Sequence, residues 1–229
     1  MRGTESDMMR QVFSLSAGMF MPRLGFPLAV VLAVLSAGCE PHLPPKPSVR
    51  LAAAETRTVV PLVRPIALVP MSAPMVVDFE LQAPGPNSSK SLMLGFRVFG
   101  SDRDHAMEIA DAIQKEGLEA EVRLTKLDAV GEHLVIIERR VLNGYGPTKM
   151  VSVSADGRVP VVVISTPDST ALDAVGLADS EGSSMSLAFA WAFRTTPGRY
   201  RLSVRLRKVP EKFSNVEAEL LLAYMHKPK

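Results

Sequence analysis

The sequence predicts a mainly β fold, an antiparallel two-sheet β-sandwich of the immunoglobulin-like or jelly-roll-like kind, with one short helix. Three observations predict this fold. About eight segments after residue 74 alternate apolar and polar side chains with the period of two that strands require. Clusters of Gly, Pro, Asn and Asp separate these segments. A single segment has helical periodicity, so the repeated strand–helix units of a parallel α/β sheet are excluded.

The first two strands and the helix follow one another along the chain. We expect strands over residues 75–81 and 92–99, each with its apolar side chains on one face. Gly95 lies inside the second strand, where a glycine marks a bulge or the close approach of a neighbouring backbone. Ser101 begins a capping-box spacing, and Gly117 stands where a helix of about three turns would end.

The remaining strands alternate with turns to the end of the chain. They are expected over residues 118–127, 134–137, 151–154, 159–164, 187–193, 200–207 and 216–224. Residues 134–137 contain only Leu, Val and Ile, so we expect this run to be buried. Residues 165–184 are rich in Ser, Asp, Thr and Gly, which predicts a long loop. Alternating large side chains give residues 187–193 one bulky face, which is expected to be core.

Composition and charge exclude several classes of function. The 229 residues carry a formal net charge of +2, without the basic field that nucleic-acid binding requires, so no nucleic-acid partner is expected. Hydrophobic residues make up 47% of the chain, which is ordinary for a globular protein. Cys39 is the single cysteine, so the chain cannot form an intramolecular disulfide.

The region before Cys39 predicts an export signal. Residues 26–37 form an apolar run that Arg23 precedes, and the run is shorter than the roughly 20 residues of a transmembrane helix. Glu5 and Asp7 are unusual in the leading region of a signal, so we expect translation to start at Met19 or Met21.

A lipid anchor is predicted where this signal ends. The stretch Leu35-Ser36-Ala37-Gly38-Cys39 resembles the lipobox of bacterial lipoproteins, with Ser36 where that family usually has Leu. The resemblance implies that a signal peptidase recognises Leu35, Ser36, Ala37 and Gly38. It further implies that Cys39 receives acyl chains, which attach the protein to a membrane. Residues 1–38 would then be the signal peptide. Glu40, in place of an aspartate after the cysteine, favours the outer membrane, with the domain facing the periplasm.

Proline enrichment after the anchor predicts a tether. Residues 40–47 contain four prolines, and proline-rich segments favour extended polyproline II conformations. We therefore divide the mature chain into a lipidated tether over residues 39–72 and a β-sandwich domain over residues 73–229. Residues 59–63 and 66–69 are apolar, and it stays open at this point whether they already pack on the domain.

Three stretches are informative together: residues 94–98 before the charged helix, residues 196–201 leading to residues 209–211, and the ending over residues 223–229. Together they resemble a family of small proteobacterial β-sandwich lipoprotein domains of unknown function. In that family a Pro-Gly-Lys/Arg-Tyr strand entry and a closing Tyr-His-x-Pro-like ending recur. The resemblance implies a sandwich fold and an envelope location, and it implies no catalytic residues.

The chain offers little catalytic or metal chemistry. Asp102, Asp104, His105 and Glu108 have suitable side chains, but acids at the start of a helix are favoured by its dipole alone. No Gly-x-Ser-x-Gly motif and no metal-ligand spacing of His residues occurs. We therefore expect a protein that is not an enzyme, with no catalytic residue, cofactor or metal.

A row of basic residues is the candidate binding face. Arg199, Arg201, Arg205 and Arg207 share one face of an expected strand. Such a row suits anionic lipid headgroups, lipopolysaccharide or an acidic protein, and it is equally the ordinary solvated face of a strand. We therefore expect a membrane-anchored binding module with a protein partner in the periplasm, for example an immunity-type protein that neutralises a toxin. An accessory of envelope assembly is the alternative, and a hydrolase is less favoured.

Overall fold

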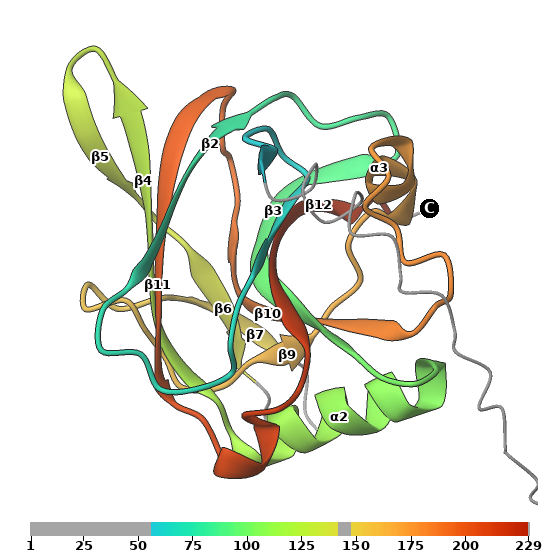
Figure 1. Cartoon of the computed structure of the whole chain (residues 1–229). Helices are drawn as coiled ribbons and strands as arrows, with labels where there is room; N and C mark the ends of the chain where they lie inside the picture. The colour runs from blue at the N-terminus through green and yellow to red at the C-terminus, as the bar shows by residue number, and fades with distance from the viewer. Residues whose placement is uncertain (1–55, 142–147, 229) are drawn as a thin grey trace, which may run out of the picture. The chain divides into compact units, whose positions relative to one another are not determined.

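Two antiparallel sheets face each other in the computed structural model, which describes residues 56–141 and 148–228 (Figure 1). Sheet A has the order β2 (Met75–Leu81), β11 (Gly198–Lys208), β4 (Glu119–Asp128) and β5 (Gly131–Val135), and β8 (Arg158–Val159) also pairs with β4. Sheet B has the order β1 (Leu62–Pro65), β12 (Ala218–His226), β3 (Ser88–Phe99), β10 (Ser184–Ala192), β6 (Glu138–Val141) and β7 (Lys149–Ser152), and β9 (Val163–Ile164) also pairs with β10. The predicted β-sandwich is confirmed.

Alternation along the strands separates the core from the surface. In β11, Tyr200, Leu202, Val204 and Leu206 are buried, while Arg and Ser side chains alternate with them on the other face. Leu202 pairs with Val77 of β2 on one side and with Leu124 of β4 on the other. The rings of Phe96 and Phe189 of sheet B contact each other within the same core, tilted by 36° with 5.1 Å between their centroids. Burial of such side chains is the main source of stability.

Gly95 lies at the closest approach of two strands, as predicted. A Cβ atom at this position would lie 2.2 Å from the carbonyl oxygen of Leu187. Gly95 pairs with Ala188 of β10, and the register shifts between Ala188 and Ala190, which is the signature of a β-bulge. Only glycine lets the two backbones come this close.

The domain begins before the boundary at residue 73 that the sequence predicted. Residues 58–71 form a strap along the open side of the sandwich. The amide of Val60 donates to Glu80 of sheet A, β1 pairs with β12 of sheet B, and the amide of Met71 donates to Leu206 of sheet A. Leu62 and Leu68 of the strap are fully buried. The prolines around these apolar residues concealed a strand, because a proline at the end of a short edge strand costs no ladder hydrogen bond.

The structure contains two α-helices among the described residues, where the sequence predicted one. α2 (Arg103–Glu116) packs across one end of the sandwich (Figure 1), with Asp102 as its N-cap and Gly117, at φ 82°, after its last turn. The second helix, α3 (Ser169–Ala174), lies inside the expected loop over residues 165–184, and a 3-10 turn, η1 (Glu211–Phe213), precedes β12. A helix of six residues is too short to have an apolar period, so only its Asp168 cap could have revealed it.

The strand expected over residues 159–164 is split between the sheets. β8 pairs with β4 in sheet A, and β9 pairs with β10 in sheet B. Pro160 lies between them and has no amide hydrogen to donate, so it interrupts the ladder where the chain crosses over. A similar crossing carries the chain from β5 in sheet A to β6 in sheet B.

A second apolar layer covers the outer face of sheet B. Leu172 and Leu177, from the segment that contains α3, pack with Met93, Trp191 and Leu221 of the sheet. No helix among the described residues is long and apolar enough to cross a membrane.

Candidate docking surface

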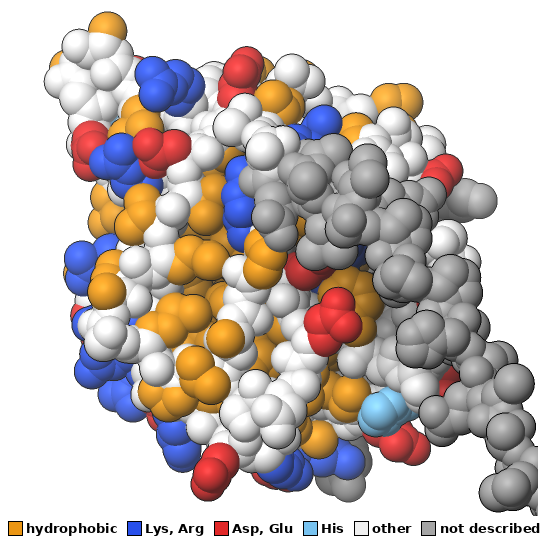
Figure 2. Space-filling model, viewed as in Figure 1, with side chains coloured by type: hydrophobic (Ala, Val, Ile, Leu, Met, Phe, Trp, Pro, Cys, Tyr) orange, Lys and Arg blue, Asp and Glu red, His pale blue; other side chains and the backbone are white. Residues whose placement is uncertain are grey.

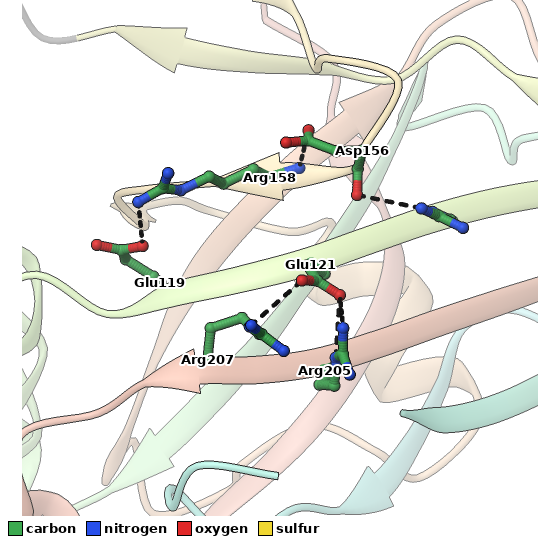
Figure 3. A network of polar contacts seen from close by, with 7 residues as sticks. Glu119, Glu121, Asp156, Arg158, Arg205 and Arg207 are labelled. Atoms are coloured by element: carbon green, nitrogen blue, oxygen red, sulfur yellow. Dashed lines mark hydrogen bonds and ion pairs between the residues drawn. The ribbon is translucent and has the colours of Figure 1, made fainter. Parts of the chain in front are cut away.

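The predicted arginine row lies on the outer face of sheet A, and most of its charge is paired. Arg201 contacts Asp78 of β2 at 2.7 Å and Glu132 of β5 at 2.8 Å. Arg205 and Arg207 both contact Glu121 of β4. Figure 3 shows the two guanidinium groups pointing at this one carboxylate, beside the pair of Arg158 and Glu119.

Pairing changes what the row can bind. The hydrogen bonds from Arg205 lower the pKa of the Glu121 carboxyl, and those from Arg201 lower the pKa of the Asp78 carboxyl, so both carboxylates stay ionised at neutral pH. Arg199 is the member of the row for which the described residues supply no ion pair. The outer face of sheet A therefore presents alternating charges rather than a continuous basic surface.

The hairpin of β4 and β5 extends beyond the rest of the sandwich (Figure 1). We call residues 125–136 the arm. Its two-residue turn is held by the Asp128 carboxylate, which accepts hydrogen bonds from the amides of Val130 and Gly131. β5 is the last strand of sheet A, and no described strand pairs with its other edge. A strand edge of this kind presents unpaired backbone donors and acceptors to a partner.

Exposed apolar side chains follow this free edge. Val130 is 87% exposed, Leu134 64% and Ile136 73%, so the expectation that residues 134–137 are buried was wrong for Leu134 and Ile136. Figure 2 shows hydrophobic side chains reaching the tip of the arm. Leu134 pairs with Thr125 on the outer face of sheet A, the face that carries Arg201, whereas its neighbour Val135 pairs with the buried Leu124. Because sheet B packs on the other face of sheet A, it does not cover Leu134.

Two hollows lie at the foot of the arm, and Ile136 lines both. The smaller hollow, of about 240 Å³, lies between the arm and residues 152–157 and has mainly aliphatic walls. The larger hollow, of about 580 Å³, is lined by Lys90, Ser91, Ile136, Glu138, Phe193 and Arg194. We call the larger one the foot hollow. It joins the apolar edge of β5 to cationic side chains from β3 and from the end of β10.

Two cations that have no carboxylate partner among the described residues, Lys90 and Arg194, line the foot hollow. Arg140 stacks over the ring of Trp191, with 5.2 Å from its guanidinium carbon to the ring centroid. Among the described residues, Glu138 is the one acidic residue that lines the hollow. This unpaired charge contrasts with the paired row on sheet A.

Sequence reasoning missed these cations because they come from separate segments. The pairing of β3 with β10 brings Lys90 and Arg194 to one hollow, and the pairing of β10 with β6 places Arg140 beside Trp191. The pair Arg139-Arg140 was the one local signal available in the sequence.

A buried carboxylate, Asp168, fixes the segment that covers sheet B. Asp168 is 1% exposed, caps α3 and accepts a hydrogen bond of 2.5 Å from the Ser88 hydroxyl. His226 lies 3.9 Å from its other oxygen. Burial alone would raise the pKa of this carboxyl, but the Ser88 hydroxyl, two helix amides and the His226 imidazole outweigh burial and lower it. The carboxylate lies between Ser88 and His226, so the histidine is not placed to activate the hydroxyl as a base.

The acidic cluster at the start of α2 is a helix cap. Asp102 accepts a hydrogen bond of 2.9 Å from the His105 amide, and the His105 ring accepts one of 3.1 Å from the Ser101 amide. Within residues 56–141 and 148–228, no group of His, Cys, Asp and Glu side chains could hold a metal ion. Cys39 and the predicted recognition residues Leu35, Ser36, Ala37 and Gly38 lie outside the described residues.

Comparison with known proteins adds one distant match. No family model and no curated protein matches the chain. A crystal structure of a protein from Sulfurospirillum deleyianum matches with a TM-score of 0.36 and 10% sequence identity, over 73% of this chain and 98% of that one. The function is therefore inferred from the chain's own geometry.

Proposed function

We propose that this protein is a bacterial lipoprotein of the envelope whose β-sandwich binds another protein through the arm. The observation that carries the proposal is the free edge of β5, with Leu134 and Ile136 exposed beside it. The occupant is an extended segment of the partner, which adds a strand to sheet A. Strand addition gains affinity from backbone hydrogen bonds and specificity from side chains that alternate along the strand.

The chemistry of the edge favours a peptide over a lipid. A strand edge offers both amide donors and carbonyl acceptors at regular spacing, and another strand satisfies both. A lipid headgroup supplies acceptors but not the matching ladder. The arginine row, which would suit anionic headgroups, is largely occupied by its own carboxylates.

A second copy of the chain fits the arm less well than a different protein does. In a two-fold antiparallel pairing along β5, the foot of one arm lies opposite the tip of the other. The carboxylates near the tip are already engaged, Asp128 with backbone amides and Glu132 with Arg201. A second copy would therefore leave the cations at the foot without partners.

The proposed anchor is Cys39, through its acyl chains, in the outer membrane with the domain facing the periplasm. Because the strap belongs to the sandwich, the tether between Cys39 and the domain is shorter than the residues 39–72 that the sequence predicted. Anchoring raises the concentration of the arm near a partner in the same compartment. An immunity-type role and a role in envelope assembly differ in the partner, a delivered toxin or an envelope component.

The first prediction concerns the arm. We expect Leu134→Asp to abolish a complex that the wild-type protein forms, because a carboxylate beside the edge opposes apolar contact. Native electrophoresis of detergent-solubilised envelopes measures the size of the complex. Val76→Asp is the matched control. Val76 is also an exposed aliphatic side chain, at 54%, but it lies on β2 at the opposite edge of sheet A. Both variants should keep the wild-type melting temperature.

The arm prediction has two contradicting outcomes. Equal loss of the complex in both variants would show that any charge on sheet A is disruptive. A wild-type species with the mass of two copies of this chain would assign the arm to self-association.

The second prediction concerns the anchor. We expect Cys39→Ser to move the protein from the membrane fraction to the soluble fraction and to abolish incorporation of labelled palmitate, because serine has no thiol to form the thioether. Fractionation and labelling in the native host measure both effects. Continued membrane attachment of the Cys39→Ser protein, or absence of label in the wild type, would contradict the lipoprotein assignment.

A further inference from the structure

We infer that the foot hollow receives an acidic side chain of the strand that docks on β5, so that the partner segment combines alternating apolar residues with an aspartate or glutamate. The inference rests on the proposed function and specifies the chemistry of the partner. It is carried by the contents of the hollow and by its position at the end of β5.

The hollow has the charge and the size to bind a carboxylate with its apolar stem. Lys90 and Arg194 line it without an ion pair among the described residues, against one acidic side chain, Glu138. Phe193 and Ile136 supply apolar wall, and Ser91 supplies a hydroxyl. About 580 Å³ exceeds what a single Asp or Glu side chain needs, so neighbouring partner residues fit as well. Charge-assisted hydrogen bonds from Arg and Lys are the strongest available to a carboxylate.

The position of the hollow links it to strand addition. Ile136 directly follows β5 and lines the hollow, so a segment that runs along residues 131–135 reaches the hollow within one or two further residues. The apolar contacts at Leu134 and the charged contacts at the hollow therefore belong to one continuous surface. A single partner segment can make both.

The backbone at Arg194 gives an independent sign that its side chain matters. Arg194 has φ 61°, the only left-handed backbone among the described residues that are not glycine. Glycine adopts this conformation at lower cost than arginine does. Local conflicts of this kind tend to lie at functional positions. An Arg194→Gly variant thus separates folding from binding, because it removes the charge and relieves the backbone.

The test uses two short synthetic peptides that alternate Thr and Val, one ending in a pair of aspartates and the other in a pair of lysines. Fluorescence anisotropy measures their binding to the full-length lipidated protein in uncharged detergent micelles at low salt. We expect the acidic peptide to bind about tenfold more tightly than the basic one. Lys90→Glu and Arg194→Gly should each remove most of this difference, and Glu138→Gln should increase it.

Controls separate this inference from the proposed function. Lys115→Glu makes the same charge change as Lys90→Glu on an exposed residue of α2, and it should leave the preference intact. Arg194→Gly should keep or raise the melting temperature. Leu134→Asp should weaken the binding of both peptides.

Each other outcome overturns a stated part of the inference. Equal binding of the two peptides, or tighter binding of the basic one, overturns the acidic specificity and leaves strand addition standing. Failure of both peptides to bind overturns strand addition itself, and the acidic specificity with it. Displacement of the acidic peptide by phosphatidylglycerol added to the micelles, without any effect of Leu134→Asp, would assign the hollow to lipid. Dimerisation of the protein that excludes the peptide would assign the hollow to a second copy of this chain.

Discussion

The Gly95→Ala variant is expected to lose about 3 kcal/mol of its free energy of unfolding, a large part of the stability of a typical domain. The added methyl group would lie 2.2 Å from the Leu187 carbonyl oxygen and 3.0 Å from the Ala188 Cα atom. Both neighbours are backbone atoms, so no side chain can rotate away to make room. β3 and β10 would have to separate at the centre of sheet B. Urea unfolding followed by circular dichroism measures the loss.

A matched glycine substitution controls for the general effect of adding a methyl group. Gly85→Ala lies in the turn before β3, where the new Cβ atom would meet only the Ser88 hydroxyl oxygen, at 3.7 Å. It should change the free energy of unfolding by less than about 1 kcal/mol. If Gly95→Ala lowered the free energy of unfolding no more than Gly85→Ala does, this result would contradict the close approach of β3 to β10 at Gly95.

The Asp168→Ala variant is expected to lose about 2–4 kcal/mol, because one substitution removes a helix cap and leaves the buried Ser88 hydroxyl without its acceptor. Asp173→Ala, on the exposed side of the same helix, is the control and should change stability little. Equal effects of the two substitutions would contradict the role of Asp168. The measurement is again urea unfolding at neutral pH.

The effect of Asp168 should depend on pH in a defined direction. Its pKa in the folded protein lies below the ordinary value of 3.8, so the ionised carboxylate stabilises the fold fully above that value. The contribution is lost as the pH falls through the lower pKa of the folded state. The stability gap between the wild type and Asp168→Asn should therefore narrow from neutral pH to about pH 3. A gap that stays constant over this range would show that the charge of Asp168 is irrelevant.

The architecture was accessible from the sequence because its strands obey the period of two. The apolar side chains of β2 and β11 alternate, and β2, β3, β11 and β12 each form close to their expected bounds. The expected helix has its cap at Asp102 and its end at Gly117 for the local reasons that the sequence displays. Gly95 was recognised because a glycine inside a strand usually has a steric cause.

The candidate site was harder to predict from the sequence, because it depends on which neighbours each strand faces in the folded domain. The Leu, Val and Ile of residues 134–137 predict burial, whereas Leu134 is exposed because the register places it on the outer face of sheet A. The charge of the arginine row is cancelled by carboxylates on neighbouring strands, whose register the sequence does not give. The cations at the foot hollow are isolated in the sequence and meet only through the pairing of sheet B. The predicted boundary at residue 73 wrongly assigned the strap to the tether, because prolines interrupt its apolar residues.

The central claim is that the free edge of β5 holds an extended segment of another protein. It is tested most directly by placing a photo-activated cross-linking amino acid at position 134 of the full-length protein in its native envelope, and by sequencing the cross-linked peptide. We predict an adduct to a segment of a different protein with alternating apolar residues and an adjacent Asp or Glu, which the same probe at position 76 does not give. An adduct to lipid, to a second copy of this chain or to a basic segment would contradict the claim, as would the absence of any adduct at position 134.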